Sequence, residues 1–200
     1  MKFSILILAI FLTSMPVNSE DQIVETSATN QSFIKRWWSA TKDNVSKIYN
    51  EGNDDFYLTG YAYHDRWTYT KEKLNDLNEG AYGGGLGRSI INAKGNTEML
   101  YVMSHLDSHN DVQINAGYAW ARKFKIAGDF KAGLGYTAFL VSRSDFAGRF
   151  PLPFALPLVT LDIDDVSIMG ILIPKLNDGI NNGNVLFIFA KFTWERKKSI

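Results

Sequence analysis

The chain contains no cysteine and no long apolar run, and its charges cancel. An exported protein without disulfides has to be held by its core or by a closed ladder of hydrogen bonds. No segment reaches the roughly 20 apolar residues of a membrane-spanning helix. The 21 basic and 21 acidic residues leave no basic excess, which argues against a nucleic-acid partner. A disulfide framework and a helical membrane span are therefore excluded.

The beginning of the chain has the pattern of a secretory signal peptide. The first two residues give a positively charged start, and residues 3–15 are mostly apolar. Val17-Asn18-Ser19 places small or β-branched residues where a signal peptidase reads, so we expect cleavage after Ser19. A membrane anchor is the alternative, but the apolar run is too short for a span. We therefore assign residues 1–19 to a signal peptide.

Residues 20–55 are expected to form a polar segment followed by an amphipathic helix. Apolar side chains recur at helical spacing, basic residues are available to the other side, and Ser32 is a possible N-cap. A basic amphipathic helix with two tryptophans suits a membrane surface, and an ordinary helix packed on a core is the alternative. The apolar stripe consists of Phe33, Ile34, Trp37, Trp38, Val45, Ile48 and Tyr49.

Residues 56–200 show the alternation of a β-barrel. From about Tyr57 to Trp194, apolar or aromatic residues recur at every second position, in runs broken by Gly, Asn, Asp and Pro. Alternation over roughly ten residues, repeated about eight times, is typical of a transmembrane β-barrel. The aromatic content of 14% suits aromatic girdles at both bilayer faces. We predict an all-β fold, an eight-stranded antiparallel transmembrane β-barrel preceded by the amphipathic α-helix.

The alternation also predicts which faces and ends the strands present. In the first strand, Tyr57 falls on the lipid face and His64 on the lumenal face. Long loops follow the odd-numbered strands and short turns the even-numbered ones. Outer-membrane barrels keep their short turns in the periplasm, so both termini are expected there, with Asp107 at the outer rim. The expected strands are Tyr57–Tyr69, Tyr82–Ile91, Glu98–Leu106, Val112–Lys123, Lys131–Arg143, Phe154–Ile163, Val166–Ile173 and Val185–Trp194.

The expected lumen is unusually apolar. Its inward set includes Gly135, Thr137, Phe139 and Val141, and the last strand is apolar on both faces. Such a lumen in a small barrel either is packed solid or holds an apolar ligand.

Three histidines offer the main candidates for chemistry. His64, with Asp107 and Ser108, supplies an imidazole, a carboxylate and a hydroxyl, the set that a nucleophilic or general-base mechanism uses. From residue types alone, a solvated loop beside a hydrogen-bonded histidine is the alternative. His105 and His109 straddle a strand end and a loop, and no cysteine assists them, so we expect no metal and no cofactor.

Several short motifs share their order and spacing with one family. Together they resemble the lipid A palmitoyltransferase (PagP) family of outer-membrane enzymes, over roughly Tyr57 to Phe192. The resemblance implies an eight-stranded barrel that moves a palmitoyl-like chain from a glycerophospholipid to lipid A. The motifs are Tyr69-Thr70-Lys71-Glu72-Lys73, Tyr82-Gly83-Gly84-Gly85-Leu86-Gly87, Asp107-Ser108, Gly133-Leu134-Gly135-Tyr136-Thr137-Ala138, Pro151-Leu152-Pro153, Leu156-Pro157-Leu158 and Asn181-Asn182-Gly183-Asn184-Val185.

The resemblance also assigns roles to residues. The family's essential His, Asp and Ser fall on His64, Asp107 and Ser108. On this reading His64 acts as general base and Asp107 orients its imidazole. Ser108 is either an attacking hydroxyl or a donor to the oxyanion. We expect the loop that carries Asp107 and Ser108 to close on substrate.

The resemblance further implies an acyl-chain well inside the barrel and a lateral route for lipid. The well is expected at Gly135, Thr137 and Phe139, and Phe139 stands where the family has a small residue that sets its depth. The phenyl ring should therefore shorten or reshape the well. Prolines that loosen strand pairing are kept in part, because the family's prolines on the first two strands are Thr59 and Ala81 here. Those kept are Pro151, Pro153, Pro157 and Pro174.

The preferred interpretation is thus a monomeric acyltransferase at the outer face of the outer membrane, with a phospholipid donor and lipid A as acceptor. A non-catalytic structural or adhesive barrel is the first alternative. A soluble lipid-binding barrel of the lipocalin sort is the second. The expected lipid-facing aromatics argue against the second alternative. They are Tyr61, Tyr63, Trp67, Tyr118 and Trp120.

Overall fold

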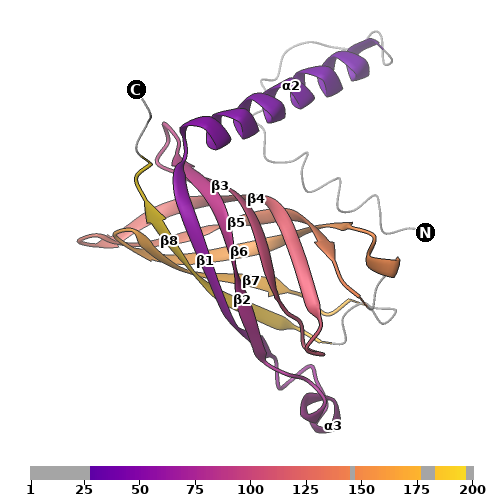
Figure 1. Cartoon of the computed structure of the whole chain (residues 1–200). Helices are drawn as coiled ribbons and strands as arrows, with labels where there is room; N and C mark the ends of the chain where they lie inside the picture. Colours follow the sequence, from indigo (N-terminus) through magenta and orange to yellow (C-terminus); the bar gives the residue numbers. More distant parts are fainter. Residues whose placement is uncertain (1–27, 145–146, 177–182, 197–200) are drawn as a thin grey trace. The chain divides into compact units, whose positions relative to one another are not determined.

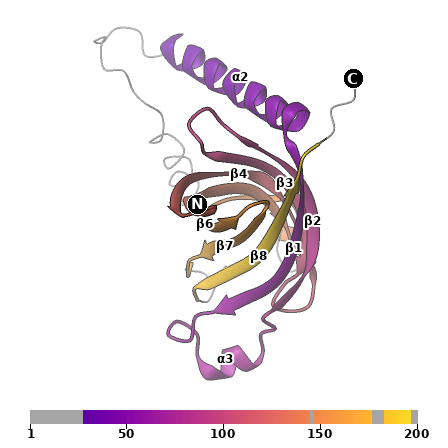
Figure 2. The same ribbon diagram turned by 90° about the vertical axis from the view of Figure 1, so that its left-hand side faces the viewer.

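Eight antiparallel strands close into a barrel in the computed structural model, which describes residues 28–144, 147–176 and 183–196. Each strand pairs with its neighbours in chain order, and β1 closes the ring with β8 (Figures 1 and 2). This confirms the predicted fold class, while the predicted signal peptide lies outside the described residues. The strands are β1 (Asn53–His64), β2 (Gly80–Ile91), β3 (Thr97–Leu106), β4 (Val112–Ala127), β5 (Phe130–Ser142), β6 (Leu152–Ile163), β7 (Val166–Ile173) and β8 (Val185–Trp194).

The predicted helix is present as α2 (Ala28–Glu51). Ser32 lies within it and is therefore not its N-cap. The helix divides between two units, since residues up to Lys47 form one and Ile48 onward belongs to the barrel unit. Of the predicted apolar stripe, Trp38 is exposed and Ile48 is buried. The side chains of Phe33, Ile34 and Trp37 are not among those that the structure describes. No helix in the described ranges is both long and apolar enough to cross a membrane.

The two ends of the barrel differ in the length of their connections. Short turns at residues 92–96, 128–129 and 164–165 lie at one end, the short-turn end, where β1 also begins and β8 finishes. Longer connections lie at the other, the long-loop end, and the first of them carries α3 (Lys71–Asn75) (Figure 1). The third carries the 3₁₀ helix η1 (Ala147–Arg149). The predicted alternation of long loops and short turns holds with one exception, since the connection from β3 to β4, residues 107–111, is no longer than the turn at residues 92–96.

A β-bulge in β1 overturns the predicted lipid-facing position of Tyr57. Its side chain is 1% exposed and lies inside the barrel. The pairing register shifts between Thr59 and Tyr61, and a bulge adds a residue that reverses which face the following side chains occupy. Odd-numbered residues therefore face inward before Gly60 and even-numbered ones after it. The bulge is what allows both Tyr57 and His64 to point into the lumen.

The first strand also ends earlier than its aromatic pattern predicts. It finishes at His64, and residues 65–69 fold into a turn in which the Asp65 carbonyl accepts from the N–H groups of Thr68 and Tyr69. Trp67 is 95% exposed in this turn, whereas Tyr69, expected on the lipid face, is buried. Local hydrogen bonding by Asp65 competes here with continued strand pairing.

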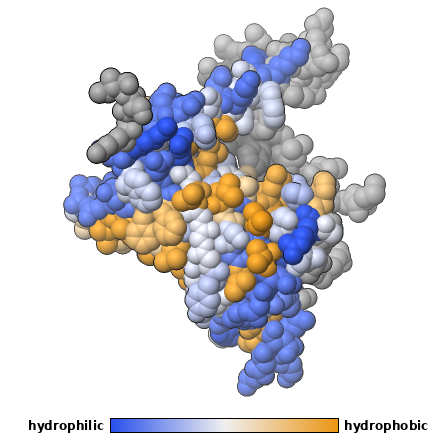
Figure 3. Space-filling view, viewed as in Figure 1, coloured by the Kyte–Doolittle hydropathy of each residue, from blue (hydrophilic) through white to orange (hydrophobic). Residues whose placement is uncertain are grey.

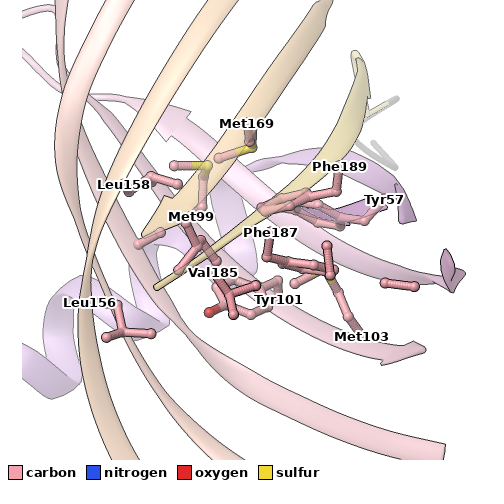
Figure 4. Close-up of a cluster of buried hydrophobic side chains, with 14 of the residues drawn as sticks. Tyr57, Met99, Tyr101, Met103, Leu156, Leu158, Met169, Val185, Phe187 and Phe189 are labelled. Atoms are coloured by element: carbon pink, nitrogen blue, oxygen red, sulfur yellow. The ribbon is translucent and has the colours of Figure 1, made fainter. Parts of the chain in front are cut away.

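A hydrophobic cluster fills the middle of the lumen (Figure 4). The ring of Tyr57 lies 5.9 Å from that of Tyr101 and 6.2 Å from that of Phe189, measured between centroids. These contacts join β1, β3 and β8 across the barrel. The labelled members in Figure 4 are Tyr57, Met99, Tyr101, Met103, Leu156, Leu158, Met169, Val185, Phe187 and Phe189.

The short-turn half of the lumen is polar, which corrects the prediction of an apolar interior. Asp55 accepts hydrogen bonds from Lys191, Ser89 and Thr193. A second ion pair joins Lys123 to Asp162 at 2.8 Å. Buried charges are tolerated because each is paired and hydrogen-bonded. These residues sit near strand ends, where the alternating pattern of the sequence is weakest.

The outer surface of the barrel carries a belt of exposed apolar side chains. Figure 3 shows hydrophobic residues, in orange, across the middle of the barrel and hydrophilic residues, in blue, around α3. A contiguous apolar surface of this kind is the face that a barrel presents to lipid. Members of the belt include Phe56, Leu58, Leu86, Val102, Leu134, Leu140, Leu161, Ile168, Leu172 and Phe192.

Candidate functional site

A cavity of about 310 Å³ opens in the long-loop half of the barrel. Apolar side chains such as Met103, Ile171 and Phe187 line its wall, and His64 and Ser108 lie at its polar mouth. The sequence left open whether the lumen is packed solid or hollow. The short-turn half is packed and the long-loop half is hollow.

His64 and Ser108 come together although 44 residues separate them. His64 is the last residue of β1, and Ser108 lies in the turn between β3 and β4. The imidazole Nε2 is 3.0 Å from the Ser108 hydroxyl oxygen. The ring is 1% exposed, and its centroid lies 5.2 Å from that of Tyr69 in an edge-on arrangement. The pair can therefore exchange a proton in surroundings that exclude most water.

Asp107 lines the same cavity but makes no hydrogen bond or ion pair with His64. One carboxylate oxygen accepts from the backbone N–H groups of His109 and Asp111, at 2.8 and 3.0 Å. The other lies 3.4 Å from the guanidinium of Arg143. Asp107 thus shapes the turn that presents Ser108. Because the two residues occupy a turn rather than a strand, both side chains line the cavity.

The carboxylate beside the imidazole is that of Glu79, which sequence reasoning missed. Its Oε1 lies 3.5 Å from Nδ1 of His64. Glu79 directly precedes β2, opposite the end of β1, where Tyr61 pairs with Gly80. A correct end for the first strand would have placed the two side by side, but the aromatic run to Tyr69 hid that end.

Glu79 is held by four donors. Arg66 donates to both of its oxygens, at 2.6 and 2.8 Å. Tyr61 donates its hydroxyl at 2.6 Å, and the backbone N–H of His64 donates at 3.0 Å. The hydrogen bonds from Arg66, assisted by the others, hold the pKa of the Glu79 carboxyl down at about 2. Glu79 is therefore ionised at neutral pH.

Comparison with known proteins identifies the family. Residues 44–191 match the family described as "Antimicrobial peptide resistance and lipid A acylation protein PagP". The chain belongs to the PagP family. A lipid A acyltransferase PagP of Bordetella pertussis strain Tohama I is 44% identical over 159 residues, covering 80% of this chain and 85% of that protein. The namesake of Legionella pneumophila strain Philadelphia 1 is 38% identical over 169 residues, covering 82% and 88%.

Membership of the PagP family confirms the resemblance seen in the motifs and makes the chain an acyltransferase.

The three residues expected at the PagP acyl well occupy different levels of the lumen. Phe139 lines the cavity, and its ring stacks on that of Phe154 with centroids 6.2 Å apart. Thr137 is buried, bonds to the hydroxyl of Tyr101 and does not line the cavity. Gly135 permits a close approach of β4, since a Cβ there would lie 1.8 Å from the carbonyl oxygen of Trp120. Of the three, Phe139 alone borders the hollow.

The prolines expected at the PagP lipid route flank an incomplete ladder between β6 and β7. Pairing begins at Leu158 with Ile171 and runs only toward the short-turn end. Residues 152–157 of β6, including Pro153 and Pro157, pair with β5 alone. Pro151 precedes β6 and Pro174 follows β7. By contrast, β1 stays paired with β2 up to Tyr61, past Thr59. Leu156, Ile171 and Ile173 line the cavity, so the hollow borders this seam.

Proposed function

We propose that this protein transfers a fatty acyl chain from a glycerophospholipid to a hydroxyl of lipid A, at the outer face of the outer membrane. The observation that carries the proposal is the contact of His64 with Ser108 at the mouth of an apolar cavity inside a lipid-facing barrel. The relatives named lipid A acyltransferases support the acceptor.

The cavity binds the acyl chain of the donor. Burying a chain in an apolar wall stabilises it by about 0.8 kcal/mol per methylene. Because His64 and Ser108 lie at the mouth, a chain inserted methyl end first holds its ester beside these two residues. Phe139 borders the hollow and limits how far the chain descends. The chain transferred is therefore shorter than a well with a small residue at this position would accept.

The chemical step is a base-assisted ester exchange. Nε2 of His64 takes the proton from the attacking hydroxyl, whose oxygen bonds to the carbonyl carbon of the donor ester. The bond from that carbon to the glycerol oxygen breaks. The leaving oxygen receives the proton back from the imidazolium, which releases a lysophospholipid and leaves the chain esterified to lipid A.

Ser108 has two roles compatible with its position. As a nucleophile, it would give its proton to Nε2 and carry the acyl group before lipid A accepts it. As a donor, it would stabilise the oxyanion while lipid A attacks directly. The mass of the intact protein after incubation with phospholipid alone separates the two roles. An added acyl mass indicates the first role, and an unchanged mass indicates the second.

The lipid route is the seam between β6 and β7. Proline has no N–H to donate to a ladder of hydrogen bonds. Pro153 and Pro157 therefore keep the part of β6 nearest the long-loop end, residues 152–157, unpaired with β7. The cavity borders this gap, which allows a lipid in the same leaflet to insert its chain sideways. The family's second pair of prolines is absent at Thr59 and Ala81, and the paired β1–β2 seam is correspondingly a poorer route.

Purified protein in micelles with acyl-labelled phospholipid and lipid A tests the proposal. Wild-type protein should move the label to lipid A, and His64→Ala and Ser108→Ala should not. Circular dichroism of the variants controls for loss of the barrel. Failure of the folded wild-type protein to transfer label would favour a non-catalytic barrel.

A further inference from the structure

We propose that Glu79, rather than Asp107, is the carboxylate that positions the imidazole of His64 for acyl transfer. The inference rests on the proposed function, since it assigns a positioning residue to the same site. In this arrangement Arg66 holds Glu79 in place, and Glu79 positions the general base, His64. Asp107 stabilises the turn that carries Ser108.

The two nitrogens of His64 face two different partners. Nε2 lies 3.0 Å from the Ser108 hydroxyl, and Nδ1 lies 3.5 Å from Glu79 Oε1. Nδ1 is buried and makes no hydrogen bond with the described residues, so the carboxylate acts on it through its negative charge, which favours the tautomer that carries the proton on Nδ1. That tautomer leaves the lone pair of Nε2 free to accept a hydroxyl proton. The same negative charge stabilises the imidazolium formed when the proton arrives.

Arg66 fixes the carboxylate relative to the histidine backbone. Its guanidinium donates to both oxygens of Glu79, and Nη1 also donates to the carbonyl oxygen of His64 at 2.7 Å. It lies over the ring of Tyr63, 5.0 Å from the centroid. Bidentate pairs of this kind add geometric specificity as well as energy. The charge beside Nδ1 is therefore held in place rather than free to swing into solvent.

The residue before Glu79 ties this support to Ser108. The backbone N–H of Asn78 donates to the backbone carbonyl of Ser108 at 2.9 Å. The Asn78 side chain bonds to Asn110 in the same turn and to the backbone N–H of Gly80. Two adjacent residues, Asn78 and Glu79, thus hold the hydroxyl and the imidazole of the site at once.

Asp107 lacks the contacts that such a role needs. One of its oxygens accepts from the backbone of its own turn, and the other, which accepts no hydrogen bond within the described ranges, lies beside Arg143 and not beside His64. Among the described residues, Glu79 is the acidic residue that forms an ion-pair contact with His64.

Kinetics of label transfer by full-length protein in micelles test the inference. Glu79→Gln keeps the size of the side chain and removes the charge, and we expect kcat to fall by about 10- to 1,000-fold. KM for the phospholipid should stay within about twofold, because lost positioning acts in the transition state. Glu79→Asp should recover part of kcat. Glu72→Gln is the matched control, an exposed glutamate of the same loop, and should behave as wild type.

The tautomer of His64 provides a readout that does not depend on turnover. Nitrogen-15 NMR of the labelled protein should show the proton on Nδ1 in the wild type. In Glu79→Gln the proton should be distributed over both nitrogens, with the barrel signals unchanged. A Glu79→Gln protein with wild-type kcat and an unchanged tautomer overturns the inference.

The failure of this inference and the failure of the proposed function are distinguishable. If the wild type transfers label, His64→Ala does not, and Glu79→Gln equals the wild type, then Glu79 is not the positioning residue while the transfer function stands. If folded wild type transfers no label, the proposed function fails, and with it the role assigned to Glu79.

Discussion

Single side chains at the mouth of the cavity have separate tasks. His64 meets the Ser108 hydroxyl through one nitrogen and the Glu79 carboxylate through the other. Asp107 binds the backbone of its own turn. The sequence pointed to His64, Asp107 and Ser108 by residue type and by resemblance. It did not point to Glu79, because a lone glutamate in a polar loop carries no pattern until the end of the neighbouring strand is known.

Replacement of Asp107 separates its charge from its role as an acceptor. Asp107→Ala leaves two backbone N–H groups of the turn without their acceptor, and each lost hydrogen bond costs about 0.5–1.5 kcal/mol. We expect transfer activity to fall at least about tenfold and hydrogen exchange of residues 109–111 to accelerate. Asp107→Asn keeps an accepting oxygen and should lose less on both measures. If the two variants were equally inactive with a protected turn, the charge itself would be required.

Phe139 is predicted to control the length of the acyl chain. Phe139→Gly removes the ring that borders the hollow and deepens the well, at a stability cost of about 3–5 kcal/mol. The preferred donor should then shift toward longer chains, read from the mass of lipid A after competition among phospholipids of different length. Leu140→Gly, on the lipid-facing side of the same strand, is the control. An unchanged preference in Phe139→Gly would show that another residue limits the chain.

At the scale of elements, the sequence pattern predicts the bounds of regular strands correctly, but it does not predict those of a strand that contains a bulge. The bounds predicted for β7 and β8 are those observed, because clean turn residues enclose their alternating runs. β1 departs, since one bulge at Gly60 reverses the facing of its side chains and the turn at Asp65 ends it early. Alternation alone cannot reveal a bulge, because a strand that is aromatic on both sides looks the same in either register.

The open seam between β6 and β7 predicts an effect of a tether. The chain has no cysteine, so an introduced pair is the only disulfide possible. Continuing the observed register sets Leu156 opposite Ile173. The double variant Leu156→Cys and Ile173→Cys should lose label transfer when oxidised and recover it when reduced. A tether at Thr160 and Met169, already paired, should have little effect. Full activity of the oxidised Leu156–Ile173 protein would rule out this route.

The whole molecule divides into a hollow half and a packed half. The cavity occupies the long-loop half, and the ion pairs of Lys191 with Asp55 and of Lys123 with Asp162 fill the short-turn half. A chain that enters from the lipid or from the mouth therefore meets a closed floor. The sequence predicted the barrel and its two kinds of connection, but not this division. The charges that make it come from strands distant in sequence and pair only once the barrel closes.

The packed half is predicted to carry stability rather than chemistry. Asp162→Ala leaves the buried ammonium of Lys123 without its partner, and breaking such a pair costs about 3–5 kcal/mol. The midpoint of urea unfolding in micelles should fall accordingly. Transfer per folded molecule should stay near the wild-type value, since the ion pair lies at the end opposite His64 and Ser108. A large loss of transfer from folded protein would mean that the two halves are coupled.

Mass analysis of lipid A from cells that produce or lack the protein tests the central claim most directly. Cells with the wild-type chain should contain a lipid A species heavier by one fatty acyl group. Cells with an equal amount of the His64→Ala barrel should lack that species. Identical lipid A in all three strains, with the wild-type barrel folded in the outer membrane, would contradict acyl transfer at this site.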